Sequence, residues 1–226
     1  MATHLCTSCP LKSPAARNLT DEELGILEKN SALVHFKKGE IIFREDALST
    51  NVAYLRTGIA KIHKRGPAAD KILRVVKAPT YLGIPTSMGE KINQFSATAL
   101  VETSVCFIDT NLFRNFIFQN GAFAYEIIME LCRHELNDYQ RFTSQSQKQV
   151  PGIVAETLLC FSEKIFANTR FQFPLTRGEI GDLVGTSRES VSRVLTDLAG
   201  EGIITYDARE ITILDPERLK QISDKG

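Results

Sequence analysis

The sequence lacks the segments that mark membrane-spanning and secreted proteins. No apolar run approaches the roughly 18 residues that a membrane-spanning helix needs. Residues 1–23 contain no continuous apolar stretch of the kind found at the centre of a secretory signal peptide. We therefore expect a cytoplasmic protein with no membrane partner.

Common enzyme motifs are missing as well. There is no glycine-rich phosphate loop, no His-Glu-x-x-His zinc pair and no nucleophile motif. We find no internal repeat and no low-complexity tract, while 43% of the 226 residues are apolar and 24% are charged. These values predict a globular protein of one large or two small domains. Because the enzyme motifs are missing, we do not expect an enzyme.

The chain has no surplus of positive charge. Its 27 basic residues balance 27 acidic ones. Residues 1–120 carry 15 basic and 11 acidic residues (+15 − 11 = +4), whereas residues 151–226 carry 9 and 12 (+9 − 12 = −3). A nucleic-acid-binding domain is usually basic. If the protein binds nucleic acid, binding must therefore depend on the positions of individual charged residues and not on the net charge.

Cysteines are few, and their number is odd. Of the five, Cys106, Cys132 and Cys160 lie in apolar stretches, where a buried reduced thiol is the usual state. Cys6 and Cys9 form the one local pair. A lone C-x-x-C pair is consistent with a redox dithiol, half a metal site or an unused tail.

Short β-rich runs alternate with turns between residues 31 and 109. The runs are 33–45, 52–66, 71–83 and 95–109, and Gly39, Gly58, Gly66 and Gly83 punctuate them at intervals suited to strand connections, which predicts an antiparallel barrel or sandwich. Ahead of them, Thr20 and Glu23 have the spacing of a capping box and predict a short helix.

After residue 110 the apolar residues recur with a helical period. Residues 111–118 predict a short helix, Gly121 breaks it, and a longer helix follows. A narrow apolar stripe along that helix fits a two-helix seam, and a helix packed on its own barrel explains the period equally well. The stripe consists of Tyr125, Ile128, Cys132, Leu136, Tyr139 and Phe142.

Two short helices with a glycine between them are predicted near the end of the chain. Thr176 and Glu179 form a second capping box at the start of the first helix. Gly185 stands where a left-handed residue would end it, and the next helix begins within two residues. This pair is the helix-turn-helix signature. Residues 202–214 then predict two strands, a wing.

The second of these helices has an apolar face and a polar face. In a recognition helix the apolar face packs on the first helix, and the polar face enters the major groove of DNA. There arginine can pair with guanine and glutamate with cytosine. An ordinary solvated face is the alternative. The expected base-reading residues are Arg188, Glu189, Ser192 and Arg193, and the expected phosphate contacts are Thr176, Arg177 and Ser187 at the two helix starts.

Residues 175–195 resemble the helix-turn-helix of the CRP/FNR family of bacterial transcription regulators. Glu189, Ser192 and Arg193 match the Glu-x-x-Ser-Arg pattern of the FNR branch, whereas the CRP branch has glycine at the serine. The resemblance covers nearly the whole chain and implies an α+β fold. Its parts would be a cyclic-nucleotide-binding-type β-roll (jelly roll) sensor domain with short flanking helices in residues 1–120, a dimerisation helix and hinge in residues 121–148, and a winged helix-turn-helix in residues 149–226.

The resemblance also indicates where an effector would bind. Cyclic-AMP-binding members hold the ribose with a Gly-Glu pair and the phosphate with an Arg-Ser pair. Here Ile84 follows Gly83 in place of glutamate, and Phe95 precedes Ser96 in place of arginine. Burying a phosphate without a cationic partner is costly, so we do not expect cyclic AMP. With Pro85, these residues line an apolar pocket or are simply core.

The FNR branch further suggests an iron–sulfur cluster held by four cysteines. Cys6, Cys9 and Cys106 match three of the four places, but Ala15 stands near the remaining one. Because such clusters need four thiolates, we expect neither a metal nor another cofactor.

The predicted fold, the helix-turn-helix and the family resemblance together lead us to expect a homodimeric transcription regulator. It would bind a pseudo-palindromic operator in double-stranded DNA under control of an unknown signal at the β-roll, with RNA polymerase as a candidate further partner. The alternative is a ligand- or redox-responsive module whose helix-turn-helix contacts protein, and the acidic C-terminal third favours it.

Overall fold

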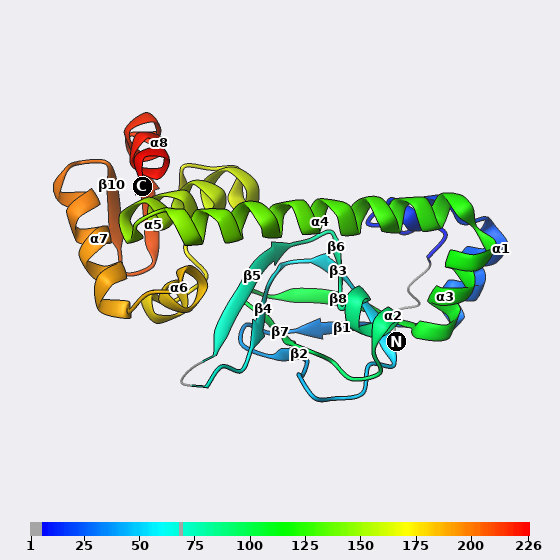
Figure 1. Cartoon of the computed structure of the whole chain (residues 1–226). Coiled ribbons are helices and arrows are strands. Elements are labelled where there is room, and N and C mark those ends of the chain that lie inside the picture. Colours follow the sequence, from blue (N-terminus) through cyan, green and yellow to red (C-terminus); the bar gives the residue numbers. More distant parts are fainter. Residues whose placement is uncertain (1–5, 68–69) are drawn as a thin grey trace. The chain divides into compact units, whose positions relative to one another are not determined.

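The computed structural model describes residues 6–67 and 70–226, which form two compact units. One unit contains the chain up to Lys64 together with Leu73–Glu135, and the other contains Arg65–Ile72 with Leu136–Gly226. Within the described residues, no helix combines the length and hydropathy needed to cross a membrane. The elements of the first unit (Figure 1) are α1 (Asp21–Lys29), β1 (Ser31–Phe36), β2 (Ile41–Phe43), β3 (Asn51–Thr57), β4 (Ile59–Lys64), β5 (Lys71–Lys77, which begins in the second unit), β6 (Thr80–Leu82), α2 (Ile84–Gly89), β7 (Ser96–Ala99), β8 (Thr103–Asp109), α3 (Thr110–Gln119) and the first half of α4 (Gly121–Gln147).

Two four-stranded sheets form the β-roll of the first unit. Their strand orders are β1-β8-β3-β6 and β2-β7-β4-β5. Each predicted β-rich run supplies two strands, which confirms the all-β organisation of this region. Gly58 joins β3 to β4 at φ 95°, and a Cβ there would lie 2.8 Å from the carbonyl oxygen of Glu102. Only glycine suits this turn, because both its conformation and its close neighbour exclude a side chain.

Strand β3 has apolar side chains on both faces because both faces are covered. Successive side chains of a strand point to opposite faces. Ala53 and Leu55 point between the two sheets, whereas Val52 and Tyr54 point outward to α1, α3 and α4. We call the first cluster the inner core (Ile42, Ala53, Leu55, Ala60, Ile62, Leu82, Ala97, Ala99 and Val105). We call the second the outer core; it includes Leu24, Leu27, Val52, Tyr54, Tyr81, Ile84, Cys106, Ile108, Phe113, Phe116, Phe123 and Ile127.

Helix α4 continues unbroken from Gly121 to Gln147 (Figure 1). It buries Phe123 and Ile127 in the outer core. The predicted stripe lies elsewhere on the helix, and none of its six members is buried in the single chain: the exposed fractions are 60% for Tyr125, 55% for Ile128, 62% for Leu136, 59% for Tyr139 and 72% for Phe142, and Cys132 is exposed as well. These residues therefore do not pack on the barrel of their own chain.

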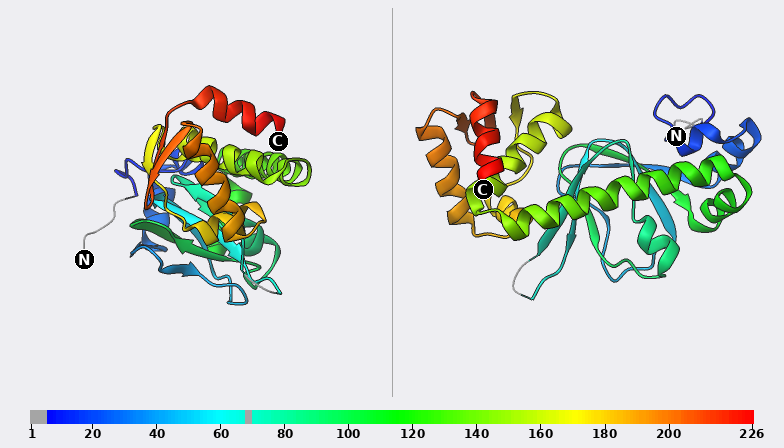
Figure 2. Two further views of the ribbon diagram at one scale, coloured as in Figure 1. Left: turned by 90° about the vertical axis from the view of Figure 1, so that its left-hand side faces the viewer. Right: turned by 45° about the horizontal axis from the view of Figure 1, so that its top comes forward.

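The second unit ends in a helical domain with a small sheet (Figure 2). Its strands β9 (Arg170–Gln172), β10 (Ile204–Asp207) and β11 (Glu210–Ile213) have the order β10-β11-β9. The two predicted wing strands, β10 and β11, thus gain a third neighbour, β9, that was not predicted from the sequence. A π-helical turn at Phe161–Phe166 also went unpredicted. The elements are α5 (Val150–Cys160), β9 (Arg170–Gln172), α6 (Arg177–Val184), α7 (Arg188–Gly200), β10 (Ile204–Asp207), β11 (Glu210–Ile213) and α8 (Pro216–Lys225).

Candidate nucleic-acid interface

Helix α6 begins and ends as its sequence predicts. The Thr176 hydroxyl accepts a hydrogen bond from the backbone N–H of Glu179 (3.2 Å), and the Glu179 carboxylate accepts one from the backbone N–H of Thr176 (2.8 Å). Gly185 caps the other end in the left-handed region, at φ 83°. Ser187 is the N-cap of α7, where its hydroxyl accepts from the backbone N–H of Ser190 (3.1 Å). A three-residue turn therefore joins the two helices.

Gly181 lets α6 and this turn approach each other. A Cβ at Gly181 would lie 2.6 Å from the carbonyl oxygen of Thr186, a distance that side-chain carbons do not adopt. The backbone N–H of Thr186 in turn donates to the carbonyl of Gly181 (3.0 Å). The sequence analysis missed this residue. Its signal was a glycine in the middle of a short helix, where glycine is costly unless packing requires it.

Helix α7 presents two different faces. Its buried residues are Val191, Val194, Leu195 and Leu198, the four that the sequence assigned to the apolar face. On the other side Arg188, Glu189 and Arg193 are exposed, and Ser192 is half-buried. The predicted base-reading residues thus lie on the N-terminal part of the helix surface, opposite its buried side.

Glu189 is held by groups at the start of its own helix. The backbone N–H of Glu189 and the Ser187 hydroxyl, both at the helix start, lower the pKa of the Glu189 carboxyl. Within the part of the chain that the structure describes, no ion pair joins Glu189 to Arg193. The exposed Arg193 guanidinium therefore has no carboxylate partner on its own helix.

Arg177 lies beside the predicted base-reading face. Its guanidinium carbon lies 5.1 Å from the centre of the Tyr206 ring in β10, and its Nη1 donates to the Ser192 hydroxyl at 3.5 Å. Tyr206 also has its hydroxyl 3.3 Å from that of Thr196. A groove of about 470 Å³ lies beside this contact. The residues that line it include Thr176, Arg177, Arg188, Tyr206 and Arg209. The contact of Tyr206 with Arg177 was not predicted from the sequence, because no residue near Tyr206 in the chain indicates which helix it packs against.

The predicted effector positions divide between the two cores. Ile84 is buried in the outer core, whereas Phe95 packs beside the inner core, with its ring centre 6.0 Å from that of Phe43. The Ser96 hydroxyl accepts from the backbone N–H of Glu45 (2.9 Å). Gly83 is the left-handed N-cap of α2, and Pro85 in its first turn is exposed. Ile84 thus lies in packed core.

Three of the cysteines surround one small cavity. Cys6, Cys9 and Cys106 line a space of about 40 Å³ together with Arg56, Tyr54 and other residues. The sequence placed two of these cysteines at the N-terminus and the third in a strand about a hundred residues later. Packing of the N-terminal segment on the outer face of the β-roll brings them together.

Comparisons with known proteins match both ends of the chain. The cyclic nucleotide-binding domain model matches residues 33–120, and the Crp-like helix-turn-helix domain model matches residues 154–222. The transcriptional activator protein Anr of Pseudomonas protegens is 27% identical over 220 residues, which cover 95% of this chain and 89% of Anr. The nitrogen fixation regulation protein FixK of Bradyrhizobium diazoefficiens is 27% identical over 227 residues, or 97% of this chain and 94% of FixK.

A solved structure shows the same fold. FixK2 from Bradyrhizobium japonicum superposes with a TM-score of 0.77 at 21% identity, over 85% of this chain and 96% of that one. The two domain models follow each other in the order that the residues predicted, and the capped helices, three-residue turn and polar α7 face lie inside the second. The chain therefore belongs to the CRP/FNR family of transcription regulators, which are DNA-binding proteins and not enzymes.

Proposed function

We propose that this regulator acts as a homodimer on a pseudo-palindromic operator in double-stranded DNA, with one α7 helix in the major groove of each half-site. The observation that carries the proposal is the exposed face of α7. Three charged side chains, Arg188, Glu189 and Arg193, stand on it, while the opposite face is buried. A helix with this division can enter a groove without exposing its core.

Each residue on this face suits a different partner. The Arg193 guanidinium can donate to O6 and N7 of one guanine, and the Glu189 carboxylate can accept from N4 of a cytosine. Ser192 is then available to a neighbouring base. Arg188, at the edge of the face, reaches a base or a phosphate.

Phosphates fit the starts of the two helices. Thr176 and Ser187 cap α6 and α7, where the exposed backbone N–H groups and the helix dipole favour an anion. Arg177 adds a positive charge next to the base-reading face. These local features compensate for the net charge of −3 of residues 151–226.

Dimerisation through α4 accounts for its exposed apolar stripe. Monomeric proteins rarely leave a contiguous apolar patch in water. A two-fold axis along α4 would cover the stripe with its own copy. Two α7 helices related by that axis would read half-sites about one helical turn apart, roughly 34 Å.

The signal at the β-roll is then not cyclic AMP. Ile84 and Phe95 replace the two groups that would hold its ribose and phosphate. We further propose that the regulator works in the cytoplasm, where bacterial DNA lies, and that it contacts RNA polymerase when it activates a gene.

Selection of binding sites from a random DNA pool tests this proposal. The expected result is a motif with two inverted halves whose centres lie one helical turn apart. A motif without inverted symmetry would contradict the dimer, and failure to enrich any sequence would favour a helix-turn-helix that contacts protein.

A further inference from the structure

The cysteine site is built around Arg56, a half-buried arginine of β3. Nη2 of Arg56 donates a hydrogen bond to Sγ of Cys9 at 3.3 Å, and Arg56 lines the same cavity as Cys106. Nε of Arg56 is buried and finds no hydrogen-bond partner among the residues that the structure describes. Cys6 and Cys106 are buried, and Cys9 is half-exposed. No disulfide joins any of the five cysteines, all of which lie within the described residues.

An iron–sulfur cluster does not fit this arrangement. The cavity of about 40 Å³ has room for about three water molecules, whereas a [4Fe–4S] cluster contains eight larger atoms. Ala15, near the fourth ligand place, is buried and has no metal-binding atom. Within residues 6–67 and 70–226, no three His, Cys, Asp or Glu side chains are arranged to hold a metal ion.

We propose that Cys6 and Cys9 form a reversible disulfide when the protein meets a peroxide, and that this bond is a signal that the regulator senses. The two residues lie in a tight turn, in which the backbone N–H of Cys9 donates to the carbonyl of Cys6 at 3.4 Å. Residues three apart in such a turn have Cα atoms within about 7 Å. Disulfides span Cα separations of about 4.4–6.8 Å.

The chemistry needs only the two thiols and one hydrogen peroxide. The sulfur of Cys9, the more exposed of the pair, attacks the peroxide, and the O–O bond breaks. One oxygen stays on the sulfur as a sulfenic acid, and the other leaves as water. The sulfur of Cys6 then displaces the sulfenic oxygen as a second water. Two electrons pass from the two thiols to the peroxide, and an S–S bond forms.

Arg56 suits the sulfenic intermediate. An oxygen added to Sγ of Cys9 would give the Arg56 guanidinium, which already donates to that sulfur through Nη2, a stronger acceptor near its buried Nε. Cys106 is less suited to oxidation, because burial raises the pKa of its thiol to about 11 and keeps it protonated at neutral pH. Burial also raises the pKa of Cys6, so Cys9 is the thiol of this pair that we expect to react with the peroxide first.

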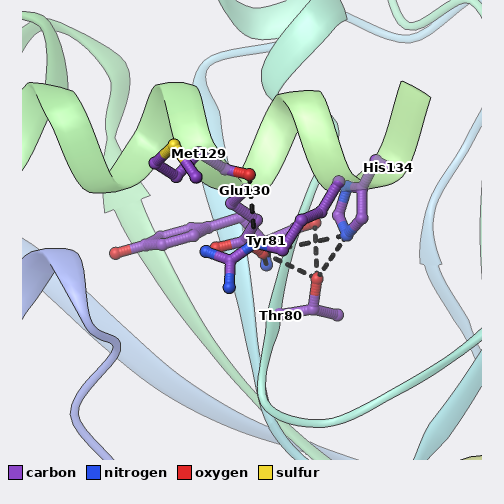
Figure 3. Close-up of polar contacts among 6 residues, drawn as sticks. Thr80, Tyr81, Met129, Glu130 and His134 are labelled. Atoms are coloured by element: carbon purple, nitrogen blue, oxygen red, sulfur yellow. Dashed lines mark hydrogen bonds and ion pairs between the residues drawn. The ribbon is translucent and has the colours of Figure 1, made fainter. Parts of the chain in front are cut away.

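Hydrogen bonds lead from this turn to α4. The carbonyl of Leu11 accepts from the Tyr54 hydroxyl (2.9 Å), and the hydroxyls of Ser13 and Tyr81 lie 2.7 Å apart. The backbone N–H of Tyr81 donates to the Glu130 carboxylate of α4 at 2.7 Å. Figure 3 shows Glu130 and His134 of α4 meeting Thr80 and Tyr81 at the end of this path; Thr80 donates to Glu130 at 2.7 Å. A change in the N-terminal segment can thus reach the helix that carries the stripe.

Peptide mapping tests the disulfide directly. Trypsin releases residues 1–12 as one peptide, with both Cys6 and Cys9, and residues 92–114 as another, with Cys106. Full-length protein is treated with hydrogen peroxide, unfolded, alkylated and digested. We expect peptide 1–12 to be two hydrogen atoms lighter and unalkylated, and to regain two alkyl groups after reduction with a dithiol. Cys160→Ser is the matched control and should leave this result unchanged, whereas Cys9→Ser should leave Cys6 open to alkylation.

Three results would overturn the proposal. One is peptide 1–12 fully alkylated after peroxide. Another is a cross-link between peptides 1–12 and 92–114, which would assign the bond to Cys106. The last is iron and sulfide at cluster stoichiometry in protein purified without oxygen.

A second readout tests the path to α4, and it alone rests on the proposed function. Oxidation should change the Kd for the selected operator by about 5- to 150-fold, the usual range of allosteric coupling. Ser13→Ala should still form the disulfide but should reduce that change. An unchanged Kd with a fully formed disulfide would refute the signalling role, and absence of operator binding in both the reduced and the oxidised protein would refute the proposed function instead.

Discussion

Helices α4 and α7 each bury one face and expose another, and the two exposed faces have opposite chemistry. The exposed face of α4 carries large apolar side chains such as Ile128 and Phe142. The exposed face of α7 carries Arg188, Glu189 and Arg193. Amphipathicity alone therefore does not identify the partner of a helix. The side chains on the exposed face are more informative. Apolar side chains are stabilised by contact with another apolar surface, whereas hydrogen-bond donors and acceptors can pair with the edges of DNA bases.

The largest effect on DNA binding should come from placing charged side chains on the exposed apolar face of α4. Ile128→Glu with Leu136→Glu places two like charges on the stripe of each protomer, where a two-fold mate would have to bury them. We expect monomers and loss of operator binding, measured by sedimentation velocity and gel shift. Asn137→Glu, exposed on the same helix but outside the stripe, is the control and should remain dimeric. An intact dimer in the double variant would remove the stripe from the interface.

Arg193→Ala removes the central donor from the α7 face. A bidentate contact to guanine is worth about 1–3 kcal/mol, so specific affinity should fall by roughly 10- to 100-fold. Binding to random DNA should change much less. Repeating the site selection with this variant checks the prediction, and recovery of the same motif at the same strength would show that α7 is not the recognition helix.

Gly181→Ala tests how firmly α6 positions the α7 face. The new Cβ would lie 2.6 Å from the Thr186 carbonyl, and relieving such overpacking costs about 1–3 kcal/mol. We expect a lower free energy of unfolding and weaker operator binding. Gly178→Ala in the same helix is a matched control, since its Cβ would meet only the Thr176 hydroxyl at 3.9 Å. Gly178→Ala should stabilise the helix by up to about 1 kcal/mol, and equal unfolding of the two variants would argue against the close approach.

Removing the aromatic ring of Tyr206, which stacks on Arg177, should have a smaller effect on DNA binding. An exposed cation–π contact is worth about 0.5–1 kcal/mol, so Tyr206→Leu should weaken DNA binding by roughly two- to five-fold. Tyr206→Phe keeps the ring and should bind almost as wild type. Arg177→Ala should weaken binding to all sequences alike and flatten its salt dependence by about one unit of slope. A change in the selected motif for either Tyr206→Leu or Arg177→Ala would instead make Arg177 a base reader.

Cyclic AMP should have no effect on any of these measurements. Phe95 replaces the cation that its phosphate needs, so calorimetry at millimolar nucleotide should show no more heat than with an unrelated nucleotide. A saturable heat in the micromolar range would contradict this.

The sequence predicted the parts of the fold that depend on near neighbours. Thr20 and Thr176 each form the capping box that residues three positions later imply, and Gly185 takes the left-handed conformation. The faces of α7 follow from a 3.6-residue period. Each of these rules operates within one turn of a helix or one hairpin, so the chain order is enough.

Contacts between distant segments could not be predicted in this way. Periodicity left it open whether the α4 stripe packs on its own barrel, and only the exposed fraction of residues such as Phe142 in the folded chain excludes that. The stacking of Arg177 on Tyr206 and the meeting of Cys9 with Arg56 depend on how separate elements pack. No local pattern carries that information.

The position of β3 between the two cores limits how the first unit can unfold locally. Its side chains belong alternately to the inner core and the outer core, so neither core can be disassembled without exposing part of this strand. Openings that separate β3 from its neighbour β8 therefore expose both cores at once, and the amide hydrogens paired between these two strands should exchange only in such openings. Deuterium uptake along the two strands, compared between reduced and oxidised protein, would show whether oxidation at the surface turn loosens the β-roll as a whole.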